Sequence, residues 1–100
     1  MKQTDKSANG TSFHDHTFSA TVGDLRKALG EPYCEQNDGE DKVNFEWIME
    51  TEEGQVFTIY DWKEYRRLDE DETVEWHIGG RSGLTTGQAL SEITKALDSV

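Results

Sequence analysis

The chain has 100 residues, enough for one domain, and 33% of them are apolar, so any core must be small. Its 21 acidic and 10 basic residues give a formal net charge of −11, which disfavours direct contact with nucleic acid because phosphates would be repelled. The single cysteine, Cys34, rules out an intrachain disulfide, and no apolar stretch reaches the roughly 18 residues of a membrane-spanning helix.

The beginning of the chain predicts a flexible leader followed by a strand. Residues 1–12 are small and polar, and we expect them to be disordered. The loosely alternating stretch 13–20 suits a first strand. Residues 13–100 are therefore expected to form one α+β domain.

A short helix is predicted directly after this strand. Thr21 and Asp24 have the spacing of a capping box, in which side chains satisfy free amides at a helix start. Gly30 can adopt a left-handed cap and Pro32 cannot continue a helix, so the helix ends there. Its apolar face comprises Val22, Leu25, Ala28 and Leu29.

Three stretches of alternating residues, 43–50, 55–62 and 73–80, predict a meander of antiparallel strands. Each alternation places one set of side chains on a single face, and we expect that face to be buried. The predicted core sets are Val43, Phe45, Trp47 and Met49; Phe57 and Ile59; and Val74, Trp76 and Ile78.

The last helix is expected to begin at Thr85, where Gln88 completes a second capping box. Its predicted buried stripe is Leu90, Ile93, Leu97 and Val100, with Ala89 and Ala96 alongside. The predicted order is β-α-β-β-β-α. It describes an α+β fold with a mostly antiparallel four-stranded sheet and two helices packed on one face.

The best candidate metal ligands are His14 and His16, because alternate residues of a strand point the same way. A third ligand would have to come from His77, Asp61 or Cys34. No set of ligands with a metal-site spacing is present, so two exposed polar residues are the favoured interpretation and no metal is expected.

No motif pairs a nucleophile with a base, so we expect no enzyme and no cofactor. Asp61 is a candidate buried carboxylate, for which an ion pair with an arginine is favoured over catalysis. Cys34 lies in an acidic loop that disfavours a reactive thiolate. The glycines around Arg81 lack a Walker lysine and predict a plain linker.

Acidic residues are concentrated in three predicted loops. If the loops lie on neighbouring edges, they form a negative surface that can imitate rows of phosphates. Solubility alone is the other explanation for the same charges. The candidate partner-binding residues are Glu35, Asp38, Glu40, Asp41, Glu50, Glu52, Glu53, Asp69, Glu70, Asp71 and Glu72.

Aromatic and basic residues interrupt this acidic field and have the composition of an interaction hot spot. They could equally neutralise nearby acids at a strand end. The candidate hot-spot residues are Trp62, Tyr65, Arg66, Arg67 and His77.

Five motifs occur in a fixed order along the chain: TSF, LRKALGEP, FEWIM, FTIYDWKEYR and EWHIGG. In this order they resemble a family of small, uncharacterised bacteriophage-encoded proteins, over nearly all of residues 10–100. The resemblance implies a phage origin and carries no activity with it.

The leading hypothesis is a non-enzymatic phage protein in the host cytoplasm. It would bind and inhibit a host nucleic-acid-handling or defence protein by inserting its acidic surface into a basic groove. We expect a monomer or small homo-oligomer that binds neither nucleic acid nor membrane directly. One alternative is a small-molecule or nucleotide binding module using the sheet face, with Tyr60, Trp62, Trp76 and His77 as walls. Another is a self-assembling phage accessory protein.

Overall fold

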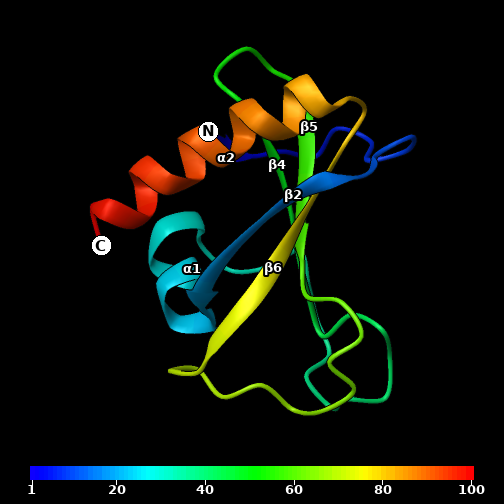
Figure 1. Ribbon diagram of the computed structural model, residues 1–100, viewed down its shortest axis with the longest axis vertical. Coiled ribbons are helices and arrows are strands. Elements are labelled where there is room, and N and C mark those ends of the chain that lie inside the picture. Colours follow the sequence, from blue (N-terminus) through cyan, green and yellow to red (C-terminus); the bar gives the residue numbers. More distant parts are fainter.

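Two helices pack against one face of an antiparallel sheet in the computed structural model, which describes residues 1–100 (Figure 1). The α+β class, the two helices and the antiparallel pairing confirm the prediction. The elements in chain order are β1 (Lys2–Gln3), β2 (Ser12–Thr21), α1 (Val22–Leu29), β3 (Cys34–Glu35), β4 (Phe45–Glu50), β5 (Val56–Tyr60), β6 (Thr73–Gly80) and α2 (Gly83–Asp98).

The sheet has six strands, so the predicted four-stranded sheet is wrong. Its order is β1-β4-β5-β6-β2, and β3 also pairs with β4. The two additional strands have only two residues each and share the outer edge of β4. Lys2 lies opposite Glu50, whereas Cys34 lies opposite Glu46. Strands of two residues are too short to show an alternating pattern in the sequence. They form because the free edge of β4 offers unpaired backbone groups.

The expected disordered leader is held at several points. Gln3 in β1 donates from Nε2 to the carbonyl oxygens of Leu29 (2.8 Å) and Glu31 (2.7 Å). Farther on, Arg81 donates to the carbonyl oxygens of Ser7 (2.9 Å) and Asn9 (3.0 Å). The segment therefore runs from the β4 edge of the sheet to its β2 edge instead of hanging free.

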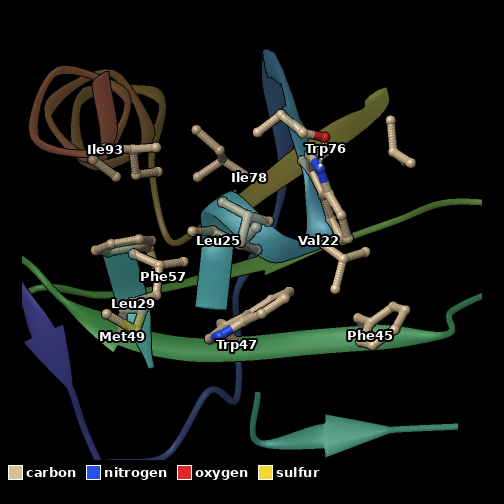
Figure 2. Close-up of a cluster of buried hydrophobic side chains, with 14 of the residues drawn as sticks. Val22, Leu25, Leu29, Phe45, Trp47, Met49, Phe57, Trp76, Ile78 and Ile93 are labelled. Carbon is tan, nitrogen blue, oxygen red and sulfur yellow. Dashed lines mark hydrogen bonds between the residues drawn. The ribbon is translucent and has the colours of Figure 1, made fainter. Parts of the chain in front are cut away.

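The core lies between the helices and the sheet (Figure 2). The rings of Trp47 and Trp76 meet edge to face, with centroids 5.6 Å apart. Their indole N–H groups donate to the carbonyl oxygens of Gly30 and Ala20, each at 2.9 Å, so neither buried ring leaves a polar group unpaired. The predicted inward residues of β4, β5 and β6 are confirmed for Phe45, Trp47, Met49, Phe57, Ile59, Val74, Trp76 and Ile78, which are all buried. The prediction is wrong for Val43, which precedes β4, is only partly buried and lines a hollow together with Glu46 and Tyr60.

The predicted start of α1 is also confirmed. Thr21 is its N-cap, and its hydroxyl oxygen accepts from the Asp24 amide at 3.0 Å. The helix ends at Gly30, whose φ of 89° is a conformation that side-chain-bearing residues rarely adopt.

The predicted start of α2 at Thr85 is wrong. Ser82 caps the helix three residues earlier, and its hydroxyl oxygen accepts from the Thr85 amide at 3.2 Å, because serine is as good a cap as threonine. Val100, predicted to be buried, lies beyond the helix and is exposed. Ile93 and Ala89 are buried as predicted.

Candidate functional site

Two of the three acidic loops meet at one end of the sheet. The Asn37 side chain both donates to the Leu68 carbonyl oxygen and accepts from the Leu68 amide, each at 2.7 Å. At Gly39, with φ of 75°, an added Cβ would lie 2.6 Å from the Arg66 Cα, so the two backbones touch. We name residues 35–42 and 61–72 together the acidic end.

Leu68 anchors this end in the core, with 2% of its surface exposed. Its burial is not predictable from the sequence, because Leu68 stands alone among charged neighbours. The Asn-Asp-Gly stretch at 37–39 is typical of a turn, and it was the one local indication of the contact with the second loop.

Asp61 links the start of the second loop to the start of β4, where the first loop ends. It has no exposed surface, and its Oδ1 accepts from the amides of Asn44 and Phe45, each at 2.8 Å. Its Oδ2 accepts from the Asn44 side-chain amide at 3.1 Å. The expected ion pair with an arginine is wrong, because three amide donors satisfy the carboxylate instead.

The third acidic loop lies at the opposite end of the molecule (Figure 1). It joins β4 to β5 beyond the pair Glu50–Val56, whereas the acidic end begins beyond the pair Glu46–Tyr60. Glu50 is nearly buried, and a hydrogen bond from Lys6 (3.1 Å) lowers its pKa. The condition for one surface, that all three loops lie on neighbouring edges, is therefore not met, and Glu52 and Glu53 stand apart from the acidic end.

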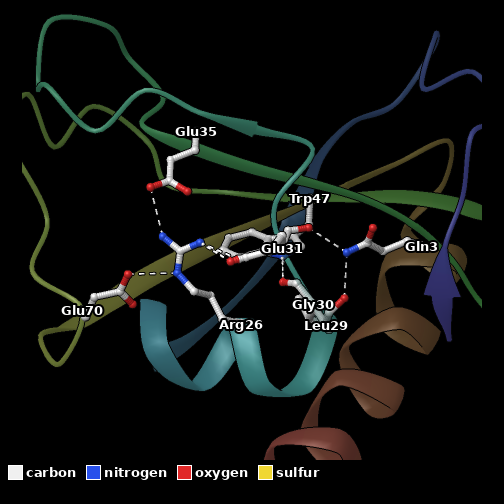
Figure 3. A network of polar contacts seen from close by, with 8 residues as sticks. All are labelled: Gln3, Arg26, Leu29, Gly30, Glu31, Glu35, Trp47 and Glu70. Carbon is white, nitrogen blue, oxygen red and sulfur yellow. Dashed lines mark hydrogen bonds and ion pairs between the residues drawn. The ribbon is translucent and has the colours of Figure 1, made fainter.

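Arg26 neutralises part of the negative charge beside the acidic end (Figure 3). Its guanidinium group lies 2.8 Å from Glu31, 3.0 Å from Glu35 and 2.9 Å from Glu70. These carboxylates, above all the hydrogen bond to Glu35, raise the pKa of Arg26 further above its ordinary value. Two predicted partner-binding residues, Glu35 and Glu70, are therefore engaged within the chain.

Arg66 has a similar role in the second loop. It lies 2.6 Å from Glu72 and 3.7 Å from Glu64. The hydrogen bond from Arg66 lowers the pKa of Glu72, and the same contact raises the pKa of Arg66. Arg66 thus fits the neutralising role better than that of a free hot-spot residue.

The remaining carboxylates of the acidic end are unpaired and exposed. The end holds ten acidic and four basic side chains, so it is strongly negative despite its ion pairs. Those without a cationic partner at the surface are Asp38, Glu40, Asp41, Asp69 and Asp71.

Of the predicted hot-spot residues, four lie together in the loop after β5 and one does not. Trp62 is 40% and Tyr65 is 53% exposed, and Arg67 is exposed without an ion pair. His77 lies in the middle of β6, where its ring is 5.7 Å from that of Tyr60.

The alternative sheet-face site loses one of its predicted walls. Trp76 is buried with the helices, on the face opposite to Tyr60 and His77. Tyr60 and Trp62 meet edge to face at 6.1 Å on the open face. An aromatic open face thus exists without Trp76.

The two histidines proposed as metal ligands contact different partners. His14 Nε2 is 3.1 Å from the Gly80 carbonyl oxygen, and His16 Nδ1 is 2.7 Å from the Thr86 hydroxyl oxygen. The strand is irregular between them, and Asp15 has a φ of 66°. No three histidine, cysteine or acidic side chains come together as metal ligands.

Comparison with known protein families, curated proteins and solved structures found no match to the chain. None of its helices combines the length and the apolar character needed to cross a bilayer. The geometry of the chain itself is therefore the basis for a functional proposal.

Proposed function

We propose that the protein is a non-enzymatic inhibitor that inserts its acidic end into a basic groove of a host nucleic-acid-handling or defence protein. The resemblance of the sequence to small bacteriophage proteins implies a phage origin, and with that origin we expect a host protein as the partner and the host cytoplasm as the setting. The proposal is narrower than the sequence hypothesis, because it uses two acidic loops and leaves out the β4–β5 loop.

The observation that supports this proposal is the clamp between the two loops. Asn37, Leu68 and the backbone contact at Gly39 fix residues that are distant in the sequence against each other. Charges that only promote solubility need no fixed spacing, whereas charges that complement a groove gain affinity and specificity from being held in place.

The mechanism is electrostatic competition. A groove lined by lysine and arginine attracts the acidic end as it attracts phosphates, and occupancy excludes the nucleic acid. Because exposed charges are screened over about 8 Å at physiological salt, binding should weaken steeply as salt is added.

The test is capture of partners from a bacterial lysate on the immobilised protein, washed at about 0.05 M and about 0.5 M salt. We expect a nucleic-acid-binding protein to be retained at low salt and released by high salt or by competing DNA. A variant with Glu40→Lys, Asp41→Lys and Asp71→Lys should lose at least about tenfold in affinity for the captured protein.

The matched control is Asp5→Lys, Glu52→Lys and Glu53→Lys, which changes the net charge equally but near the opposite end. This control should retain most of the binding. Full binding by the acidic-end variant at ordinary salt would contradict the proposal. Equal losses in both variants would also contradict it, because they would show attraction to net charge alone.

A further inference from the structure

A hollow of about 240 Å³ lies on the sheet face away from the helices. Thr58 of β5 and Gly79 of β6, which pair directly, line its floor. Tyr60 and Trp62 line one side. The one carboxylate on its lining belongs to Glu46 of β4, which lies directly opposite Tyr60 of β5.

Glu46 is half-buried and has no partner. It forms no ion pair, and its carboxylate accepts no hydrogen bond from the chain. Desolvation alone raises its pKa. The two carboxylates that are more deeply buried are both satisfied, since Glu50 pairs with Lys6 and Asp61 accepts from three amide groups.

An unpaired, partly desolvated carboxylate lowers the stability of a fold, so its presence calls for a compensating use. Residues retained at a cost to stability are commonly those that a ligand needs. The complementary ligand group is a cation.

The aromatic side of the hollow suits the same kind of ligand. The ammonium groups of Lys42 and Lys63 lie 5.9 Å and 5.5 Å from the Trp62 ring centroid, and neither forms an ion pair with a carboxylate. These two ammonium groups already occupy the charge-binding face of the indole, so what Trp62 offers a ligand is apolar contact for its alkyl part, and the ligand's charge is left to Glu46. Neither lysine neutralises Glu46, which stays available to a ligand.

We propose that this hollow is a binding site for a small alkylammonium ion. Its nitrogen lies against the Glu46 carboxylate, and its alkyl part packs on Tyr60 and Trp62. A wider hollow of about 520 Å³ shares Val43 and Glu46 with the first, so an amine with a longer chain also has room.

The test is titration of the full chain with n-butylammonium chloride, with sodium chloride held at matched ionic strength. Trp62 fluorescence is the reporter, because Trp47 and Trp76 have no exposed surface. Amide NMR shifts of Thr58 and Gly79 locate the site. We expect saturable binding with a Kd on the order of 1 mM, as is usual for so small a ligand.

Two single-charge variants separate the site from general attraction to an acidic protein. Glu46→Gln should weaken butylammonium binding at least about tenfold, since it removes the charge and keeps the shape. Glu53→Gln removes one unpaired exposed charge at the β4–β5 loop and should leave binding unchanged. Glu46→Gln should melt no lower than the wild type, which shows that lost binding is not lost folding.

Neutral n-butanol distinguishes charge recognition from simple burial of an alkyl chain. It should perturb Trp62 and the floor amides at least about tenfold more weakly than the ammonium ion. The proposal is overturned if butanol binds as well, or if Glu46→Gln and Glu53→Gln behave alike. It is also overturned if no saturable change reaches the floor amides at tens of millimolar ligand.

Discussion

At the scale of single residues, Asp61 is held entirely by amide groups. It is fully buried, yet both oxygens accept hydrogen bonds, all from Asn44 and Phe45 at the start of β4. Hydrogen bonds to charged groups contribute about 1.5–3 kcal/mol each, so this one side chain fixes how the two loops leave the sheet.

Asp61→Ala should lower the free energy of unfolding by about 3–5 kcal/mol, because it leaves three buried donors without an acceptor. Asp61→Asn should lower it by about 1–3 kcal/mol, since an amide oxygen can still face the two backbone N–H groups. Urea denaturation measures both changes. The milder variant keeps the test useful if the alanine variant does not fold.

Asp71→Asn is the matched control, because Asp71 is exposed and has no partner. Its effect should stay within about 0.5 kcal/mol of the wild type, as for most surface substitutions. If Asp61→Asn and Asp71→Asn proved equal, the hydrogen bonds of Asp61 would not be holding the loops.

The sequence predicts residues whose partners are local and fails for those whose partners are distant. Thr21 and Asp24 are three residues apart, and the predicted cap at Thr21 is confirmed, although the Asp24 carboxylate makes no hydrogen bond in return. The donors of Asp61 lie 16 and 17 residues earlier in the chain. Its burial was expected, but nothing local distinguishes an arginine partner from amide partners.

At the scale of elements, α1 joins segments that are far apart in the chain. Its last turn carries Arg26, whose three guanidinium nitrogens each contact a different carboxylate, those of Glu31, Glu35 and Glu70 (Figure 3). The guanidinium group also lies 5.6 Å from the centroid of the Phe45 ring. One planar guanidinium group can hold several carboxylates in fixed directions, which a lysine cannot do. The network therefore ties β3 and the β5–β6 loop to one helix.

Arg26→Ala should lower the free energy of unfolding by about 1–2 kcal/mol, more than a single surface ion pair contributes, because three carboxylates lose their shared cation. Arg26→Lys should recover less than half of this loss. Chemical denaturation gives the magnitude. Amide exchange at Gln36, which donates to the Asn44 carbonyl oxygen beside β3, shows whether the edge strand loosens.

Arg26→Lys is also the control for charge, since it keeps the positive charge but loses the planar set of guanidinium donors. Equal stability in all three proteins would mean that the network contributes nothing beyond isolated surface pairs. Equal losses in both variants would show that the geometry of the guanidinium, and not its charge, holds the elements.

Elements with a hydrophobic periodicity of their own were predicted well. Elements that form only by pairing with a neighbouring strand were not predicted. The core alternation of β4 and β6 follows from their own residues. The strands β1 and β3 are formed by the free edge of β4, and Gln3 is held by the end of α1. Among the candidate sites, the three acidic loops were found, but which two of them meet depends on this long-range packing.

At the scale of the whole molecule, unpaired negative charge exceeds paired charge. Seven of the 21 acidic side chains form ion pairs with amino or guanidinium groups, so repulsion among the others should dominate the net electrostatic energy. The exposed acidic residues of the acidic end lie close together and should contribute much of this repulsion. The residues of the proposed binding surface are therefore also a main source of the repulsion within the molecule.

Salt should therefore stabilise the fold while it weakens the proposed binding. Raising sodium chloride from about 0.02 M to about 0.5 M should raise Tm by about 3–6 °C, because screening relieves the repulsion. The neutral variant with Glu40→Gln, Asp41→Asn and Asp71→Asn should melt higher at low salt and gain less from added salt. Thermal melts followed by circular dichroism measure both effects.

A Tm that falls with salt would mean that the ion pairs of Arg26 and Arg66 outweigh the repulsion. In that case the acidic end would impose no cost on the fold, and its charges could be retained without any partner that needs them.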